Sequence, residues 1–233
     1  MQFVKEDQKY FNSKYFNNNG QSGDRLALQF YFDILKNYLK DGKVFEFGCG
    51  EGYLSKRIAT KFDSYAYDLS EYCRNKTKEI SPKSTIINAE ADFPSDSFNA
   101  VVTLHTLEHV PNPPETLALL NKSLKVGGIL LFVVPNPNGL GHKIKREKWF
   151  GYRDTTHISM YESSKWKELV KSSGFEIVKT ASDGFWDVPY VKYLPNILQK
   201  LIFFPSAGIQ VILKRLFLPD WFGEDLIMVA RKK

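Results

Sequence analysis

The stretch Glu46-Phe47-Gly48-Cys49-Gly50-Glu51-Gly52 (EFGCGEG) decides the fold, and it follows directly on the short apolar run KVFEF at 43–47. Its three glycines let the backbone turn sharply and approach a ligand closely, and a helix that starts just after them offers free N–H groups. The dinucleotide-binding pattern G-x-G-x-x-G is not met, because Tyr53 occupies its last position. A glycine loop after a buried strand therefore predicts a small-molecule site in an α/β fold.

Outward from this loop, short apolar runs alternate with amphipathic segments. An amphipathic helix, with Asp24 as its N-cap and Gly42 at its end, comes first. Strands are predicted at 43–47, 64–68, 84–88, 98–104, 129–134, 175–181 and 224–232, and helices near 52–62 and at 71–80, 114–125 and 162–174. Apolar strands joined by helices are typical of a parallel sheet that is buried on both faces. We therefore expect a doubly wound α/β fold with a mostly parallel seven-stranded sheet and an antiparallel last strand.

The predicted domain organisation is one domain at 24–233, preceded by an aromatic leader at 1–23. The leader aromatics (Tyr10, Phe11, Tyr15 and Phe16) are predicted to close as a lid over the site. An apolar insertion at 185–223 precedes the last strand, and Pro205 is predicted to split it into two short helices that cap the domain. The alternative is an amphipathic surface that meets a membrane or a lipid-linked substrate. Interruption by Lys200, Lys214 and Pro205 argues against a transmembrane span.

Composition limits the classes of partner and compartment. The net charge of +6 is compatible with anionic ligands but does not require nucleic acid, and none is expected. Two cysteines, Cys49 and Cys73, form no disulfide framework, and the first residues lack the apolar core of a signal peptide. A cytoplasmic protein is the simplest expectation.

The glycine loop resembles the first motif, (E/D)-x-G-x-G-x-G, of the class I S-adenosylmethionine-dependent methyltransferases. Three further stretches match: Asp68 at the end of the second strand, INAEADFPSDSFNAVV at 87–102, and LKVGGILLFVVPNP at 124–137. The resemblance covers about residues 40–181 together with the last strand. It implies the Rossmann-like methyltransferase fold and S-adenosylmethionine as the cofactor.

The resemblance also implies roles for single residues. Glu46 would lie near the methionine ammonium, Asp68 would hold the ribose hydroxyls, and Asn88 would read the adenine amino group. The family more often has Asp at position 88, which departs from the sequence here. The full set of expected cofactor contacts is Glu46, Gly48, Cys49, Gly50, Gly52, Tyr53, Asp68, Leu69, Asn88, Ala89, Glu90, Leu104 and His105.

Three ionisable residues, His105, Glu108 and His109, stand together in LHTLEHV at the end of the fourth strand, and His157 follows the fifth strand. Their i, i+3, i+4 spacing would place the first three on one face of a helical turn. The stretch after the fifth strand resembles that of type-11/12 methyltransferases, which include ubiquinone-pathway O-methyltransferases. There an E-x-x-E-H set and a later histidine hold a divalent cation, whereas His105 replaces the first carboxylate here.

Three interpretations of these four residues remain open. They could hold a divalent metal, and three imidazoles with one carboxylate would favour Zn²⁺, Fe²⁺, Ni²⁺ or Mn²⁺ over Mg²⁺. His157 or His105 could instead act as a metal-free general base. In the third interpretation the turn is structural, with Glu108 on backbone N–H groups and His109 packed under the cofactor.

The loop at 135–160 is either a rim of the acceptor site or merely a solvated charged loop. Basic residues (Lys143, Lys145, Arg146, Lys148 and Arg153) alternate there with aromatic ones, and His142 is expected to be solvated. The sequence therefore predicts methylation of a small molecule, most simply on a sugar, phenol or quinone-type hydroxyl, with an acceptor that carries an anionic or lipid part. The alternatives are a non-catalytic S-adenosylmethionine or nucleotide binder and an RNA or protein methyltransferase.

Overall fold

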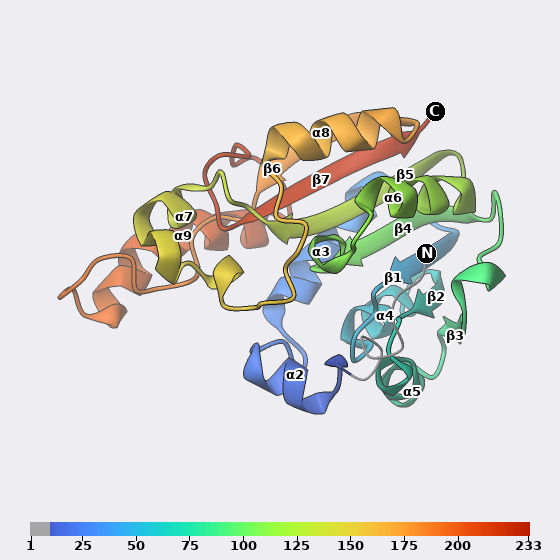
Figure 1. Cartoon of the computed structure of the whole chain (residues 1–233), viewed down its shortest axis with the longest axis horizontal. Helices are drawn as coiled ribbons and strands as arrows, with labels where there is room; N and C mark the ends of the chain where they lie inside the picture. Colours follow the sequence, from blue (N-terminus) through green and yellow to red (C-terminus); the bar gives the residue numbers. More distant parts are fainter. Residues whose placement is uncertain (1–9) are drawn as a thin grey trace.

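Residues 10–233 are described by the structure, a computed structural model (Figure 1). The strands are β1 (Lys43–Phe47), β2 (Asp63–Tyr67), β3 (Thr85–Ile86), β4 (Phe98–Leu104), β5 (Leu124–Pro135), β6 (Phe175–Ser182) and β7 (Asp225–Lys232). The α-helices are α2 (Ser13–Asn18), α3 (Leu26–Tyr38), α4 (Tyr53–Ile58), α5 (Glu71–Ile80), α6 (Pro113–Ser123), α7 (Leu140–Lys145), α8 (Ser163–Ser172) and α9 (Asn196–Leu213).

The strands form one seven-stranded sheet in the order β3-β2-β1-β4-β5-β7-β6. Strand β7 runs antiparallel to both β5 and β6, and the other pairings are parallel. The predicted α/β fold with an antiparallel last strand is therefore confirmed. Chain order reverses direction between β1 and β4, and open α/β sheets bind ligands at such a switch point, outside the carboxyl ends of the strands.

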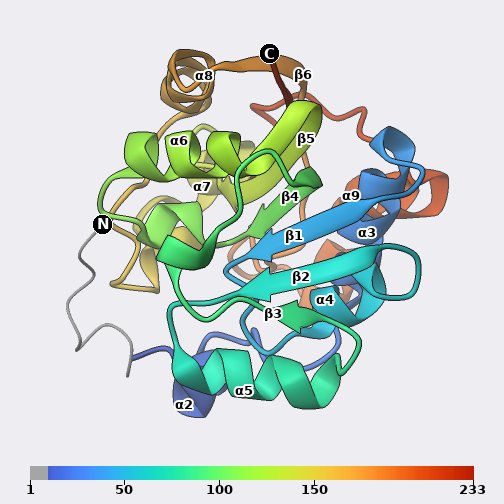
Figure 2. The ribbon, with the colours of Figure 1, turned by 90° about the vertical axis from the view of Figure 1, so that its right-hand side faces the viewer.

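Helices cover both faces of the sheet (Figure 2). On one face, α3 and α4 pack Leu35 and Ile58 against sheet residues such as Val102. On the other face, α6 and α8 pack Leu120 and Trp166 against a second buried cluster. Both faces of the central strands are thus apolar, which explains the continuous hydrophobic runs in the sequence.

Several element boundaries differ from the sequence predictions. The N-cap of α3 is Arg25, whereas Asp24 pairs with Arg57 instead of capping the helix. Strand β3 has two residues, and β5 begins five residues early because Leu124 pairs with Phe98. These differences leave the order and type of the elements unchanged.

The insertion at 185–223 holds one helix, so the prediction of two short helices was wrong. Helix α9 runs through Pro205. Proline removes one backbone donor from a helix, and a solvent-exposed face tolerates that loss best. Pro205 lies on the exposed side of α9, and the helix continues past it.

Candidate functional site

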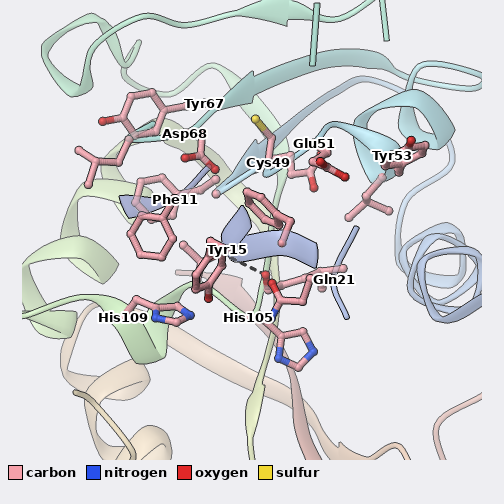
Figure 3. A pocket seen from close by; sticks show the side chains of 18 of the residues that line it. Phe11, Tyr15, Gln21, Cys49, Glu51, Tyr53, Tyr67, Asp68, His105 and His109 are labelled. Atoms are coloured by element: carbon pink, nitrogen blue, oxygen red, sulfur yellow. Dashed lines mark hydrogen bonds between the residues drawn. The ribbon is translucent and has the colours of Figure 1, made fainter. Parts of the chain in front are cut away.

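A pocket opens at the carboxyl ends of β1, β2 and β4, where the glycine loop follows β1 (Figure 3). Nine of the predicted cofactor residues line it: Glu46, Gly48, Cys49, Tyr53, Asp68, Leu69, Glu90, Leu104 and His105. The other four do not. Gly50 and Gly52 belong to the glycine loop without lining the pocket. Asn88 and Ala89 lie exposed beside the pocket.

The glycine loop is held against β2 by its backbone. The N–H groups of Gly48 and Cys49 both donate to the carbonyl oxygen of Tyr67, at 2.8 and 3.0 Å. Gly48 has a φ of +79°, and a Cβ at that position would overlap the side chain of Thr106. The loop conformation therefore requires glycine at position 48 on two counts.

Glu46 is buried at the end of β1, and Ser55 Oγ donates a hydrogen bond to its carboxylate. Burial, with a contribution from the neighbouring Asp68, raises the pKa of Glu46 to about 8, and the Ser55 hydrogen bond opposes the shift. A cationic group in the pocket would favour the ionised form of this carboxylate.

Asp68 follows β2 and accepts two backbone hydrogen bonds. Gly50 N donates to Oδ2 and Ser70 N donates to Oδ1, both at 2.9 Å. Burial raises the pKa of Asp68, and these two bonds oppose that shift. The carboxylate is thereby fixed at the pocket wall, where its remaining lone pairs suit a pair of ligand hydroxyls.

The leader covers the pocket. Phe11, Tyr15 and Phe16 line it, and the Tyr15 hydroxyl donates to Asp154 Oδ2 at 2.7 Å. Asp154 belongs to the segment after β5, so this bond joins the leader to the far wall of the site. Residues 1–9 of the predicted leader lie outside the described residues.

Arg25 is a further site residue that the sequence did not predict. It lines the pocket, and its Nε has no hydrogen-bond partner among residues 10–233. Burial lowers the pKa of the Arg25 guanidinium, and nearby acidic and tyrosine groups oppose the shift. An unpaired guanidinium nitrogen in such a position suits an anionic ligand group. No local pattern marks Arg25, because the fold brings it to the loop from the start of α3.

Three of the four predicted ionisable residues form one cluster. Glu108, His109 and His157 offer one ligand atom each, and these atoms lie within 4.8 Å of one another. His105 is not part of this group, because it lies before the short helical turn Leu107–His109 and has a φ of +50°. A single helical turn from His105 to His109 is therefore not formed, although His105 Nδ1 still lies 3.5 Å from Glu108 Oε1.

His105 instead lies between two buried carboxylates. Its Nδ1 is 3.5 Å from Glu108 Oε1, and its Nε2 is 3.6 Å from Asp225 Oδ2. Burial would raise the pKa of Glu108, but the surrounding imidazoles, first His105, lower it overall. Burial and the neighbouring Asp183 raise the pKa of Asp225. These surroundings thus favour the ionised form of Glu108 and oppose ionisation of Asp225.

The structural interpretation of the turn is wrong for the Glu108 carboxylate, and the packing of His109 under the cofactor stays a prediction. His109 lines the pocket, and its ring lies 5.5 Å from that of Phe11. The backbone carbonyl of Glu108, not its carboxylate, accepts from Ile158 N and Ser159 N. Neither carboxylate oxygen of Glu108 has a hydrogen bond within the described part of the chain.

A larger cleft of about 1470 Å³ adjoins the cofactor pocket. The two cavities share six lining residues: Tyr15, Gln21, Arg25, Leu28, Leu104 and His105. The far part of the cleft is lined by Phe150, Arg153, His157 and Trp186 and by part of α9. Two ligands could therefore meet at the end of β4.

The basic loop contributes less to this cleft than its composition predicts. Of its five basic residues only Arg153 lines the cleft. Lys145 is buried and pairs with Asp187, which Arg153 also contacts. His142, predicted to be solvated, instead packs against the rings of Trp149 and Tyr152.

Comparison with known proteins identifies the fold and the family. A family described as a methyltransferase domain matches residues 22–180. A ubiquinone biosynthesis O-methyltransferase of Methylococcus capsulatus is 30% identical over 103 residues, 40% of this chain and 44% of that protein. A malonyl-[acyl-carrier protein] O-methyltransferase of a Paenibacillus species is 24% identical over 160 residues, 60% of this chain and 58% of that protein. The chain thus spans about half the length of these curated relatives.

Solved structures agree on the fold. A methyltransferase from Archaeoglobus fulgidus superposes with a TM-score of 0.66 at 18% identity, covering 95% of this chain and all of that one. One from Thermotoga maritima gives 0.63 at 17% identity, covering 99% and 96%. Because the family match covers more than half of the chain, the protein belongs to the methyltransferase domain family and has the class I fold that uses S-adenosylmethionine as its cofactor.

Proposed function

We propose that the protein transfers the methyl group of S-adenosylmethionine to a hydroxyl oxygen of a small-molecule acceptor. One observation carries the proposal: His105 lines both the cofactor pocket and the adjoining cleft. Methyl transfer from a sulfonium is an in-line displacement, so donor and acceptor must meet where the two cavities join. The relatives named for ubiquinone and malonyl substrates are both O-methyltransferases, which supports oxygen as the methylated atom.

His105 is the proposed general base. Asp225 also lines the cleft, so the Nε2 atom of His105 that lies near Asp225 is on the acceptor side. In this reaction the hydroxyl oxygen would displace the sulfonium sulfur from the methyl carbon, and Nε2 of His105 would take up the hydroxyl proton. The products are a methyl ether and S-adenosylhomocysteine. The charged Glu108 at Nδ1 orients the ring and stabilises the imidazolium that forms.

The leader acts as a lid in this proposal. Tyr15 lines both cavities and is bonded to Asp154, so α2 separates the reacting groups from solvent. Exclusion of water strengthens the electrostatic interactions within the site. Arg25 and Glu46 would then bind the carboxylate and the ammonium of the methionine part, and Asp68 the ribose.

A metal-assisted reaction is the second candidate. The residues fit a divalent ion, because Glu108 has two carboxylate oxygens without hydrogen bonds among residues 10–233 and lies with two imidazoles. His109 Nδ1 contacts Thr156, and His157 Nδ1 contacts the carbonyl of Gly151, which leaves Nε2 of each ring for a metal. Two imidazoles and one carboxylate suit Zn²⁺, Mn²⁺ or Fe²⁺, and such an ion would acidify an acceptor hydroxyl.

The acceptor is expected to be a small amphiphilic molecule. The cleft combines aromatic walls, Phe150 and Trp186, with two exposed cations, Lys14 and Arg153, and an apolar end at α9. Aromatic walls favour a flat or sugar-like group, and the cations favour an anionic part. Both cysteines are free and buried, which supports the cytoplasm as the compartment.

The test uses S-adenosylmethionine labelled in the methyl group, incubated with the protein and a cell extract that is afterwards separated into small-molecule, RNA and protein fractions. We expect labelled product from the wild type and a loss of about 10²–10⁴-fold in kcat for His105→Asn. Asparagine tolerates the positive φ at this position, so the backbone is preserved. Binding of S-adenosylhomocysteine should survive within about threefold if the ring acts only as a base, since one pocket wall contact contributes little to affinity.

Three outcomes separate the alternatives. Cofactor binding without any labelled product would support a non-catalytic binder and overturn the proposal. Label in RNA or protein fractions would assign a macromolecular acceptor. Full activity of His105→Asn, together with loss of turnover on chelation or in His157→Ala, would replace the general base by the metal.

A further inference from the structure

Helix α9 (Asn196–Leu213) exposes its aliphatic residues and buries two polar ones. Its two buried residues are Gln199 and Gln210, each with no exposed surface. Leu201 is 67% exposed and Ile212 is 78% exposed. Further exposed aliphatic residues on the same helix are Ile197, Leu198, Ile202, Ile209, Val211 and Leu213. A helix on a protein in water normally shows the opposite pattern.

The two glutamines fix this orientation. Gln210 Nε2 donates to the carbonyls of Ser182 and Asp183, and its Oε1 accepts from the N–H groups of Phe217 and Leu218. Gln199 likewise accepts from Tyr190 N and Val191 N and donates to the carbonyls of Val191 and Leu194. Rolling the helix to bury its aliphatic face would leave these backbone groups without partners. The exposed face is therefore built into the fold.

Basic and aromatic residues flank the exposed face. From Val188 to Pro219 the chain has no acidic residue, and its basic residues there are Lys192, Lys200, Lys214 and Arg215, all exposed. Tyr193, 90% exposed, precedes the helix, and the half-exposed Trp221 follows it. Aliphatic residues bordered by cations and by amphipathic aromatic rings are typical of a helix that lies in the interface of an anionic bilayer.

By length and composition, α9 is the one helix within residues 10–233 that could cross a membrane. Its geometry favours lying along the surface. Crossing would pull Gln199 and Gln210 away from the backbone groups that they satisfy, which link α9 to the end of β6 and to the segment before the helix. An interfacial helix keeps these bonds and buries only its apolar face.

We propose that the exposed face of α9 docks on an anionic lipid bilayer and that the acceptor is an amphiphile taken from that bilayer. The second part rests on the proposed methyltransferase function. Ala207, Gly208, Val211 and Ile212 of α9 line the cleft whose other end is His105. An amphiphile can place its head group at His105 while its apolar chain follows α9 into the membrane.

A second copy of this chain is the competing occupant. The charge of the region argues against it, because two copies would bring two sets of cations together with no acid between Val188 and Pro219 to pair them. Anionic head groups supply the missing charge at the membrane surface.

The docking is tested by sedimentation with vesicles of phosphatidylcholine containing about 30 mol% phosphatidylglycerol. The wild type should bind these and should bind pure phosphatidylcholine vesicles at least about tenfold more weakly. The double variant Leu201→Glu/Ile202→Glu should lose binding by at least about tenfold. The matched control is Val126→Glu, which adds a carboxylate at a 77% exposed apolar residue on β5 and should bind like the wild type. Lys192→Gln/Lys200→Gln should weaken binding to anionic vesicles only.

The position of the cleft is tested by fluorescence quenching with vesicles of the same charge whose acyl chains are brominated. Trp149 and Trp166 are buried, so Trp186 is the exposed tryptophan that remains in Trp221→Phe. Trp186 lines the cleft. Quenching of this variant is expected, and its absence despite vesicle binding would overturn the lipid-borne acceptor.

Other outcomes also decide the matter. No binding of the wild type to anionic vesicles, or unchanged binding of Leu201→Glu/Ile202→Glu, overturns the docking. Light scattering could instead show a dimer that does not bind vesicles and that becomes monomeric in this double variant. That result would assign the face to a second copy. Titration with S-adenosylhomocysteine checks that each variant is folded. Failure of the wild type to bind that ligand would refute the methyltransferase proposal, independently of the vesicle result.

Discussion

Tyr15 and Asp154 are hydrogen bonded at 2.7 Å although 139 positions separate them in the chain. The same carboxylate accepts from the N–H and hydroxyl of Thr156, whose hydroxyl lies 2.9 Å from His109 Nδ1. A single carboxylate thus links the leader over the cofactor pocket to the histidines on its far wall. Burial, followed by the bond to Asp154, raises the pKa of Tyr15, so the phenol remains a donor at neutral pH.

Tyr15→Phe should loosen the leader without removing its aromatic ring. A hydrogen bond to a charged group contributes about 1.5–3 kcal/mol, so dissociation of S-adenosylhomocysteine should become about tenfold or more faster. Stopped-flow release of the ligand measures this rate. Tyr10→Phe is the control, since Tyr10 is half exposed and should release the ligand like the wild type. Equal rates for the two variants would contradict a closing role for this bond.

Gly48→Ala should destabilise the fold by about 2–4 kcal/mol, because it combines a positive φ with overlap against Thr106. Gly127→Ala separates the two causes. Gly127 has a φ of +76°, and a Cβ added there would meet nothing within 4 Å, so this variant should lose only about 1 kcal/mol. Urea unfolding monitored by circular dichroism gives both values. Similar losses for the two variants would show that the close approach to Thr106 is unimportant.

Arg25→Ala should raise the Kd of S-adenosylhomocysteine by about 10–100-fold if the guanidinium binds the carboxylate of the methionine part. Calorimetric titration measures the change. Arg57→Ala is the matched control, because Arg57 lies on α4 and pairs with Asp24 and Gln29 outside the pocket. An unchanged Kd in Arg25→Ala would show that this arginine serves the acceptor cleft or the fold instead.

Cofactor binding should depend on pH through Glu46, whose pKa of about 8 lies far above its ordinary value. Below pH 8 the carboxylate is neutral, and a ligand ammonium that favours the charged form must displace its proton. Affinity should therefore rise by up to about tenfold per pH unit between about pH 6 and 8 and then level off. Isothermal titration in buffers of different ionisation enthalpy detects the released proton.

The raised pKa of Glu46 also predicts how the stability of the ligand-free protein depends on pH. Because the folded pKa of Glu46 is raised, its protonated form contributes stability that is complete below about pH 4.5 and is lost as pH rises to about 8. Glu46→Gln should flatten both the binding and the stability profiles in this window. A binding slope that persists in Glu46→Gln would assign the proton to another group.

The fold was largely predictable because its central strands are buried on both faces. The run FNAVVTL of β4 is apolar at nearly every position, and helices α5 and α8 have clear 3.6-residue periodicity. The start of β5 and the length of α9 depend on tertiary contacts, which the local sequence pattern does not show. Leu124 joins β5 through its partner Phe98, and Pro205 is accepted inside α9 because that side of the helix faces solvent.

The pocket beside β1 was predictable from the loop EFGCGEG, whereas the arrangement of His105, Glu108 and His109 was not. The spacing of His105, Glu108 and His109 assumes helical dihedrals from the first residue to the last. The positive φ of His105 breaks that assumption, and although histidine is enriched at positive φ, the local sequence does not show that this one adopts it. Arg25 escaped prediction for a different reason, since only the packing of α3 beside the glycine loop brings it to the pocket.

Helix α2 contributes to the walls of both cavities, and this has a kinetic consequence. Tyr15 lines both chambers, so the acceptor chamber is complete only when the leader has settled over the nucleoside. This arrangement implies a compulsory order, with the methyl donor entering first and the demethylated nucleoside leaving last. Steady-state inhibition by S-adenosylhomocysteine should then be competitive against the donor and noncompetitive against the acceptor.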